Sequence, residues 1–225
     1  MHTIQSTRFH NAAAHQAGWQ PRTSNTPVSS DIVFIGTFGT TATALTPAPL
    51  RVTDPALLDH LRTLPARVER GGSTNLTAGL DLAIGFLTTQ PLPLKKLVVI
   101  GDGEANADAD KIDDRALALR QHRITARCID VGAGAGKITL EKIALMTVKG
   151  EYAAAKSYAS LVAFLHGKRP NHGGQTRTAA VAMLIDVSPS MTSAFLDEPI
   201  TRIVAAQRAA AQFISMQAKL FGGKQ

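Results

Sequence analysis

Cysteine and long apolar stretches are both scarce in this chain of 225 residues. The single cysteine, Cys128, lies in an apolar strand-like run, so no disulfide can form within the chain and a reducing compartment is expected. No apolar run is long enough to span a bilayer, and residues 1–8 lack the apolar core of a secretory signal. These absences predict a cytoplasmic protein without a membrane partner.

Aromatic residues suited to base stacking are also few, with two tyrosines and one tryptophan. The formal net charge is +7 and the pI is about 9.9, which is weakly suggestive of an acidic partner. The lysines and arginines are scattered along the chain, however. A basic nucleic-acid-binding module is therefore retained only as an alternative, which a steep salt dependence of binding would support.

The sequence alternates between apolar strand-like runs and segments with helical spacing. Buried strands are predicted at 31–38, 97–100, 124–131 and 181–185, with helices between them. This alternation predicts an α/β fold with a doubly wound, mainly parallel central sheet flanked by helices. The length and the hydrophobic fraction of 44% suit one large domain.

The domain boundaries follow from changes in composition along the chain. Residues 1–30 carry no sustained hydrophobic period and are interpreted as an N-terminal extension with a short helix at 11–16. Residues 31–225 are expected to form a single domain. Within it, residues 167–178 are the most linker-like because they contain a proline and several glycines, and residues 178–220 supply a central strand and a long helix.

Hydroxyl and carboxylate side chains follow the ends of the predicted strands. Asp186, Ser188 and Ser190 come directly after the strand at 181–185, Asp102 follows the strand at 97–100, and Thr74 opens a helix. Because ligands of open parallel sheets bind beyond the carboxyl ends of the strands, these side chains should meet at one rim. Such oxygen donors suit Mg²⁺. A helix N-cap is the other interpretation of the Asp and Ser residues.

With these motifs, the chain resembles von Willebrand factor A (VWA) domains that carry a metal-ion-dependent adhesion site (MIDAS). That family combines Asp-x-Ser-x-Ser, a Thr in a glycine-rich loop, and an Asp before Gly after a hydrophobic strand; the matching segments are 186–190, 72–75 and 100–104. The resemblance covers roughly residues 31–220. It implies a Rossmann-like fold and a site for Mg²⁺, with Mn²⁺ and Ca²⁺ as alternatives. The implied metal ligands are Asp186, Ser188, Ser190, Thr74 and Asp102.

The order of the motifs departs from the family, in which the Asp-x-Ser-x-Ser strand comes first. Moving residues 178–220 in front of residue 31 restores the family order, so the chain resembles a circularly permuted VWA domain. The alternatives are a dimer that exchanges its terminal strand and helix and a spliced fragment of a tandem array. A smaller departure is Gly101, where family members often carry Ser or Thr.

Other motifs give weaker indications of function. Residues 132–139 are rich in glycine, but they lack the spacing of a phosphate-binding P-loop and carry Ile138 where it needs a hydroxyl. The serines are not in a Gly-x-Ser-x-Gly motif, and the seven histidines show no metal-ligand spacing. An acidic cluster at 108–114 is interpreted as solvated carboxylates at a helix start, with a second cation as the alternative.

These features predict a non-enzymatic module in which a rim-bound Mg²⁺ captures an Asp or Glu carboxylate of a protein partner. An Mg²⁺-dependent hydrolase or phosphoryl-transfer enzyme is the alternative, with Glu104 as the only nearby candidate base. Three apolar residues, Phe38, Met191 and Phe195, are expected to surround the ion. Phe195 is predicted to be exposed because Asp197, Glu198 and Pro199 follow it before the helix starts.

Overall fold

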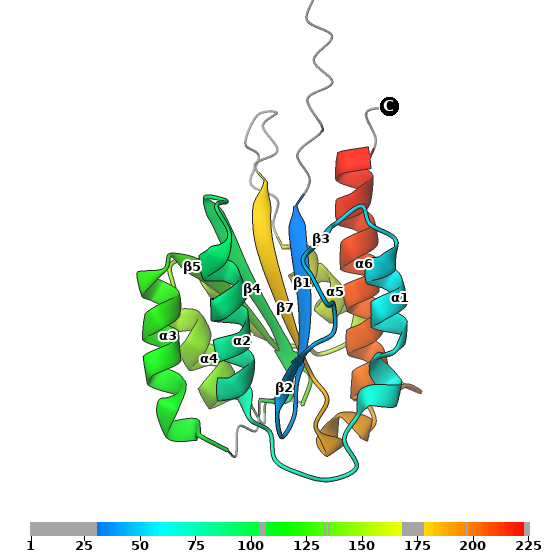
Figure 1. Cartoon of the computed structure of the whole chain (residues 1–225). Coiled ribbons are helices and arrows are strands. Elements are labelled where there is room, and N and C mark those ends of the chain that lie inside the picture. Colours follow the sequence, from blue (N-terminus) through cyan, green and yellow to red (C-terminus); the bar gives the residue numbers. More distant parts are fainter. Residues whose placement is uncertain are drawn as a thin grey trace, which may run out of the picture.

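The computed structural model describes residues 31–103, 107–132, 134, 136–167, 178–196 and 198–222. The expected N-terminal extension, its short helix and most of the expected linker lie outside the described residues. The rest forms a mixed, mostly parallel sheet with helices on both faces (Figure 1). The strands are β1 (Ile32–Phe38), β2 (Ala42–Ala44), β3 (Leu50–Arg51), β4 (Leu94–Gly101), β5 (Ile124–Asp130), β6 (Glu151–Ala154) and β7 (Ala179–Asp186).

Strand β7, the last in sequence, lies in the middle of the sheet. The strand order is β2-β1-β7-β4-β5-β6, and β3 pairs with β1. Strand β7 runs parallel to both neighbours, with Phe38 of β1 opposite Asp186 and Ile100 of β4 opposite Ile185. All eight residues of β7 are buried, as expected for a strand covered on both faces. The predicted central position of this strand is therefore confirmed, with β1 and β4 as its neighbours.

The helices divide between the two faces of the sheet, and the side chains of β7 alternate accordingly. Val181, Met183 and Ile185 pack into the apolar core beneath α1, α5 and α6. Ala182 and Leu184 pack into the second core, beneath α2, α3 and α4. The helices are α1 (Ala56–Arg62), α2 (Leu76–Thr89), α3 (Ile112–Gln121), α4 (Lys137–Met146), α5 (Tyr158–His166) and α6 (Arg202–Gly222).

Some local predictions differ from the structure. The two-residue strand β3 was not predicted, because it falls between Pro49 and the turn that precedes α1. Helix α4 begins after Gly136, so Thr139, a residue type that often caps helices, lies inside the helix. None of the helices in the described part of the chain combines the length and apolar character needed to cross a membrane.

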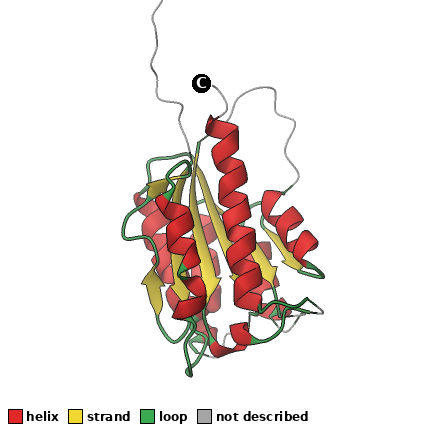
Figure 2. Cartoon of the chain, turned by 90° about the vertical axis from the view of Figure 1, so that its right-hand side faces the viewer, coloured by secondary structure: helices red, strands yellow, loops and turns green. Residues whose placement is uncertain are grey.

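The two ends of the described domain lie away from the carboxyl ends of the strands. Figures 1 and 2 both place the start of β1 and the end of α6 at the same end of the molecule. The carboxyl ends of β1, β7 and β4 lie at the opposite end, where α6 begins. We call this opposite end the rim. It brings together the loops that follow Phe38, Asp186 and Gly101.

Candidate functional site

Asp186 is the last residue of β7, and its side chain is fully buried at the rim. Its Oδ1 accepts a hydrogen bond of 2.7 Å from the backbone N–H of Ser188, a short-range turn that Asp commonly makes. Its Oδ2 is buried without a hydrogen-bond partner. Burial raises the pKa of this carboxyl to about 7, against the hydrogen bonds from Ser188, and the neighbouring charge of Asp102 raises it further.

Ser188 directly precedes a short 3₁₀ turn, Pro189–Thr192, and Ser190 lies within it. The hydroxyl of Ser188 lies 2.9 Å from that of Ser190, and Ser188 is buried while Ser190 is partly exposed. The backbone of Ser188 is extended, and its side chain does not cap the 3₁₀ turn that follows. Two hydroxyl groups therefore stand next to a buried carboxylate that has an unused oxygen.

Asp102 follows β4, and its side chain is 1% exposed. Its Oδ2 accepts a hydrogen bond of 3.2 Å from Nη1 of Arg202, whereas its Oδ1 is buried without a partner. A Cβ atom on the preceding residue, Gly101, would lie 3.0 Å from Cβ and 3.1 Å from Oδ2 of Asp186. The absence of a side chain at Gly101 therefore lets the two acidic segments approach each other.

Thr74 lies in the loop before α2 and is buried at the same end of the sheet. Its carbonyl accepts a 3.4 Å hydrogen bond from Ala107, and the next residue, Asn75, donates a 2.7 Å bond to the carbonyl of Gly39. Asn75 also caps α2 through its side chain. The structure thus brings Asp186, Ser188, Ser190 and Asp102 together and places Thr74 in an adjoining loop at the rim.

Arg202, the first residue of α6, belongs to this cluster but was not predicted from the sequence. Its side chain is 21% exposed, and its Nε is buried without a hydrogen-bond partner. One signal was available in the sequence. An arginine at the start of a long helix is unusual, because the positive end of the helix dipole favours acidic residues there.

The glycine-rich segment 132–136 has a packing role in its described residues. A Cβ atom on Gly136 would clash with the backbone of Gly103 and Asp102. The buried Asp130 accepts hydrogen bonds from the N–H of Gly132 at 2.6 Å and the hydroxyl of Tyr152 at 3.3 Å. Burial raises the pKa of Asp130, and these hydrogen bonds oppose the increase. The loop therefore packs its backbone against the residue that carries the Asp102 carboxylate.

The prediction that Phe195 is exposed beside the site is wrong, because Phe195 is buried in the core, as are Phe38 and Met191. An isolated β-bridge joins Ala194 to Thr201. Inside it, the N–H of Phe195 donates to the carbonyl of Ile200 at 2.8 Å. This bridged loop turns the ring of Phe195 inward, under α6, although the residues after it are polar. Phe195 is thus a core residue, and the prediction that it contacts a partner is withdrawn.

Two further expectations concern other acidic residues. Asp108 and Asp113 pair with lysines, Lys111 and Lys142 respectively, and Asp113 lies in the first turn of α3. The cluster at 108–114 therefore contains carboxylates engaged by lysine side chains at a helix start. Glu104, the candidate base of the enzymatic alternative, lies outside the described residues.

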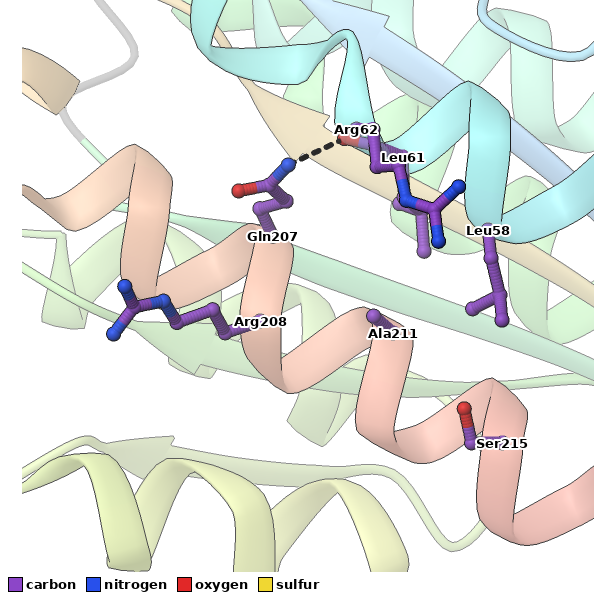
Figure 3. Close-up of a pocket in the computed structure, with 7 residues that line it drawn as sticks. All are labelled: Leu58, Leu61, Arg62, Gln207, Arg208, Ala211 and Ser215. Atoms are coloured by element: carbon purple, nitrogen blue, oxygen red, sulfur yellow. Dashed lines mark hydrogen bonds between the residues drawn. The ribbon is translucent and has the colours of Figure 1, made fainter.

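A shallow groove of about 280 Å³ lies between α1 and α6 (Figure 3). Leu58, Leu61 and Ala211 give it an apolar lining, and Nε2 of Gln207 crosses to the carbonyl of Leu61 at 3.1 Å. None of its lining residues belongs to the cluster at the rim. The groove is therefore separate from the candidate site.

Within the described ranges, no group of three or more His, Cys, Asp or Glu side chains is placed to bind a metal ion. The rim cluster is of another kind, with two carboxylates and neighbouring hydroxyls. Comparisons of the chain with protein-family models, with curated proteins and with solved structures give no significant match. The function must therefore be inferred from the chemistry of the cluster itself.

Proposed function

We propose that the chain is a circularly permuted VWA-like module that binds a divalent cation at the rim and thereby captures a carboxylate of a protein partner. The observation that carries this proposal is a pair of unused oxygens. Oδ2 of Asp186 and Oδ1 of Asp102 are buried without hydrogen-bond partners among the described residues, and the interaction between the two carboxyls contributes to the raised pKa of Asp186. Buried carboxylates that are only partly compensated are costly, and a cation is a partner that both oxygens would accept.

The chemistry of the neighbouring side chains supports a hard cation. Asp186, Asp102, Ser188 and Ser190, with Thr74 in the adjoining loop, would hold the ion through oxygen atoms, the ligand type that Mg²⁺ prefers. The backbone of Ser188 holds Asp186 in place by its 2.7 Å hydrogen bond. When bound, the cation would supply an anchor with an open coordination position for a carboxylate. The structure offers no specific observation in favour of the enzymatic or nucleic-acid alternatives.

The proposed binding of a metal ion at the rim is tested by replacing Asp186 with asparagine. D186N keeps the oxygen that accepts from Ser188 but removes the charge, so the fold should persist. Mg²⁺ and Mn²⁺ should raise the melting temperature of the wild type, because a ligand at 100 times its Kd adds about 2.7 kcal/mol of stability, and D186N should lose this response. D59N, the same change at an exposed residue of α1, is the control. An equal metal response in D186N and wild type would show that the site is wrongly assigned.

The partner chemistry is tested with random peptides displayed on phage. Selection on the immobilised protein in Mg²⁺, followed by elution with EDTA, should enrich peptides that contain Asp or Glu. The same selection on D186N should give no enrichment. Peptides that lack acidic residues, or that stay bound in EDTA, would contradict a metal-bridged carboxylate.

A further inference from the structure

Arg202 places a fixed positive charge inside the candidate site. Its backbone N–H donates to the carbonyl of Ser193 at 3.0 Å, which ties the start of α6 to the loop that carries the two serines. Its side chain reaches across to Asp102, which follows β4. The residue therefore connects the two acidic segments that the proposed function assigns to a divalent cation.

The pairing between Arg202 and Asp102 is incomplete. A guanidinium and a carboxylate can form two parallel hydrogen bonds, but here a single one of 3.2 Å joins Nη1 to Oδ2. Nε of Arg202 and Oδ1 of Asp102 stay buried and unpartnered on either side of it. Each member of the pair thus leaves part of its hydrogen-bonding capacity unused, so the contact is a poor competitor for a strong alternative partner.

The charge count explains why the arginine and a metal ion would compete. Asp186 and Asp102 can carry two negative charges, and Arg202 neutralises one of them. A divalent cation would neutralise both and would then face the guanidinium at close range. The repulsion between two cations in a mostly buried site is weakly screened. The helix dipole adds to it, because Arg202 lies at the positive end of α6.

We propose that Arg202 is a tethered cation that pairs with Asp102 in the metal-free protein and must leave it when a divalent cation binds. The arginine therefore lowers metal affinity and stabilises the metal-free fold. This inference rests on the proposed function. It also names the residue that would set the metal concentration at which the site fills.

The test compares R202M with wild type and R208M in calorimetric titrations with Mg²⁺ and Mn²⁺. Methionine keeps an unbranched apolar stem but removes the charge. Arg208 is an exposed residue of the same helix, so R208M controls for the loss of one positive charge. R202M should bind the ions at least about tenfold more tightly, which corresponds to 1.4 kcal/mol. R208M should stay within about twofold of wild type, as expected for an exposed charge.

A second measurement does not depend on the variant folding. In the ¹⁵N spectrum of the wild type, the Nε–H signal of Arg202, assigned through its backbone, should shift on addition of Mg²⁺ in step with the binding isotherm. A metal-saturated protein with an unchanged Arg202 signal would overturn the proposal.

The outcomes separate the inference from the function on which it rests. Equal affinities in wild type and R202M would overturn the inference and leave the metal site standing, and weaker binding by R202M would mean that Arg202 positions Asp102 for the ion. Binding by R202M alone would support the inference but contradict the proposed function, because the arginine would then keep the wild-type site closed to the ions. No binding by either protein would overturn both proposals.

Discussion

At the scale of single residues, the site depends on how closely the ends of β4 and β7 can approach each other. Gly101 is the contact point, since a Cβ there would lie about 3.0 Å from Asp186, tighter than side chains normally pack. The sequence had shown Gly101 as a departure from the VWA pattern, and the structure gives it a physical reason. The close approach also helps to bury Asp186, and burial raises its pKa to about 7.

We expect G101S, which restores a residue common in the family, to be harmful in this chain. The added side chain must displace Asp186 or strain the strand pairing, so the free energy of unfolding should fall by about 1–3 kcal/mol. Denaturant unfolding would measure this, with G71S as the control because a Cβ at Gly71 meets nothing within 4 Å. Equal stability of G101S and wild type would mean that the approach of the strands is not limited by this position.

At the scale of elements, Asp31 links the beginnings of β1 and β7. Its Oδ1 accepts a 2.8 Å hydrogen bond from the N–H of Ala179, the first residue of β7. Burial raises the pKa of Asp31, while this hydrogen bond and the charge of Lys96 oppose the increase. The fold therefore favours the neutral carboxyl, which still accepts the bond. The contribution to stability is largest below the unfolded pKa and is lost as the pH rises through the folded pKa.

The variant D31N should be more stable than wild type at pH 7, because an amide oxygen keeps the bond to Ala179 without a buried charge. The advantage should shrink as the pH falls below about 4, where Asp31 is protonated in both the folded and the unfolded state. Melting temperatures of the two proteins between pH 3 and pH 8 provide the comparison. A less stable D31N at pH 7 would indicate that the charged carboxylate holds the strands together.

Much of the fold and part of the site could be predicted because they depend on local patterns. The apolar run of β7 and the polar residues that end it place Asp186, Ser188 and Ser190 at the rim without knowledge of any distant contact. Arg202 and Phe195 could not be placed in this way. The orientation of each side chain is set by the loop that the β-bridge between Ala194 and Thr201 closes. The hydrophobic periodicity of the sequence does not reveal this pairing.

At the scale of the whole molecule, the proposed permutation makes a prediction about connectivity. Figures 1 and 2 place the end of α6 and the start of β1 at the same end of the molecule. A chain that begins at residue 178, joins residue 222 to residue 31 through a flexible linker of about eight residues, and ends at residue 167 should therefore fold. It should be monomeric and keep the metal response. Its melting temperature should lie within about 8 °C of wild type, equivalent to about 2 kcal/mol.

The matched control is a second rearranged chain. It has the same linker between residues 222 and 31, but its new termini lie between α2 and β4. If the control folds and the family-order chain does not, the proposed relation to VWA domains loses its support. Light scattering would detect a dimer that exchanges β7 and α6, and a dimer that forms only in the natural order would favour the strand-exchange alternative.

The central position of β7 has a consequence for how the chain folds during its synthesis on the ribosome. Strands β1 and β4, which flank β7, are synthesised long before it, and β7 is the last of the described strands to emerge. Until then, each of them has an open edge and an uncovered apolar surface, the features that lead nascent chains to aggregate or to recruit chaperones. The sheet can close only after β7 has emerged between its two neighbours. Closure of the sheet is therefore delayed until the last of the described strands has been made, whereas a chain in the family order would receive its central strand first.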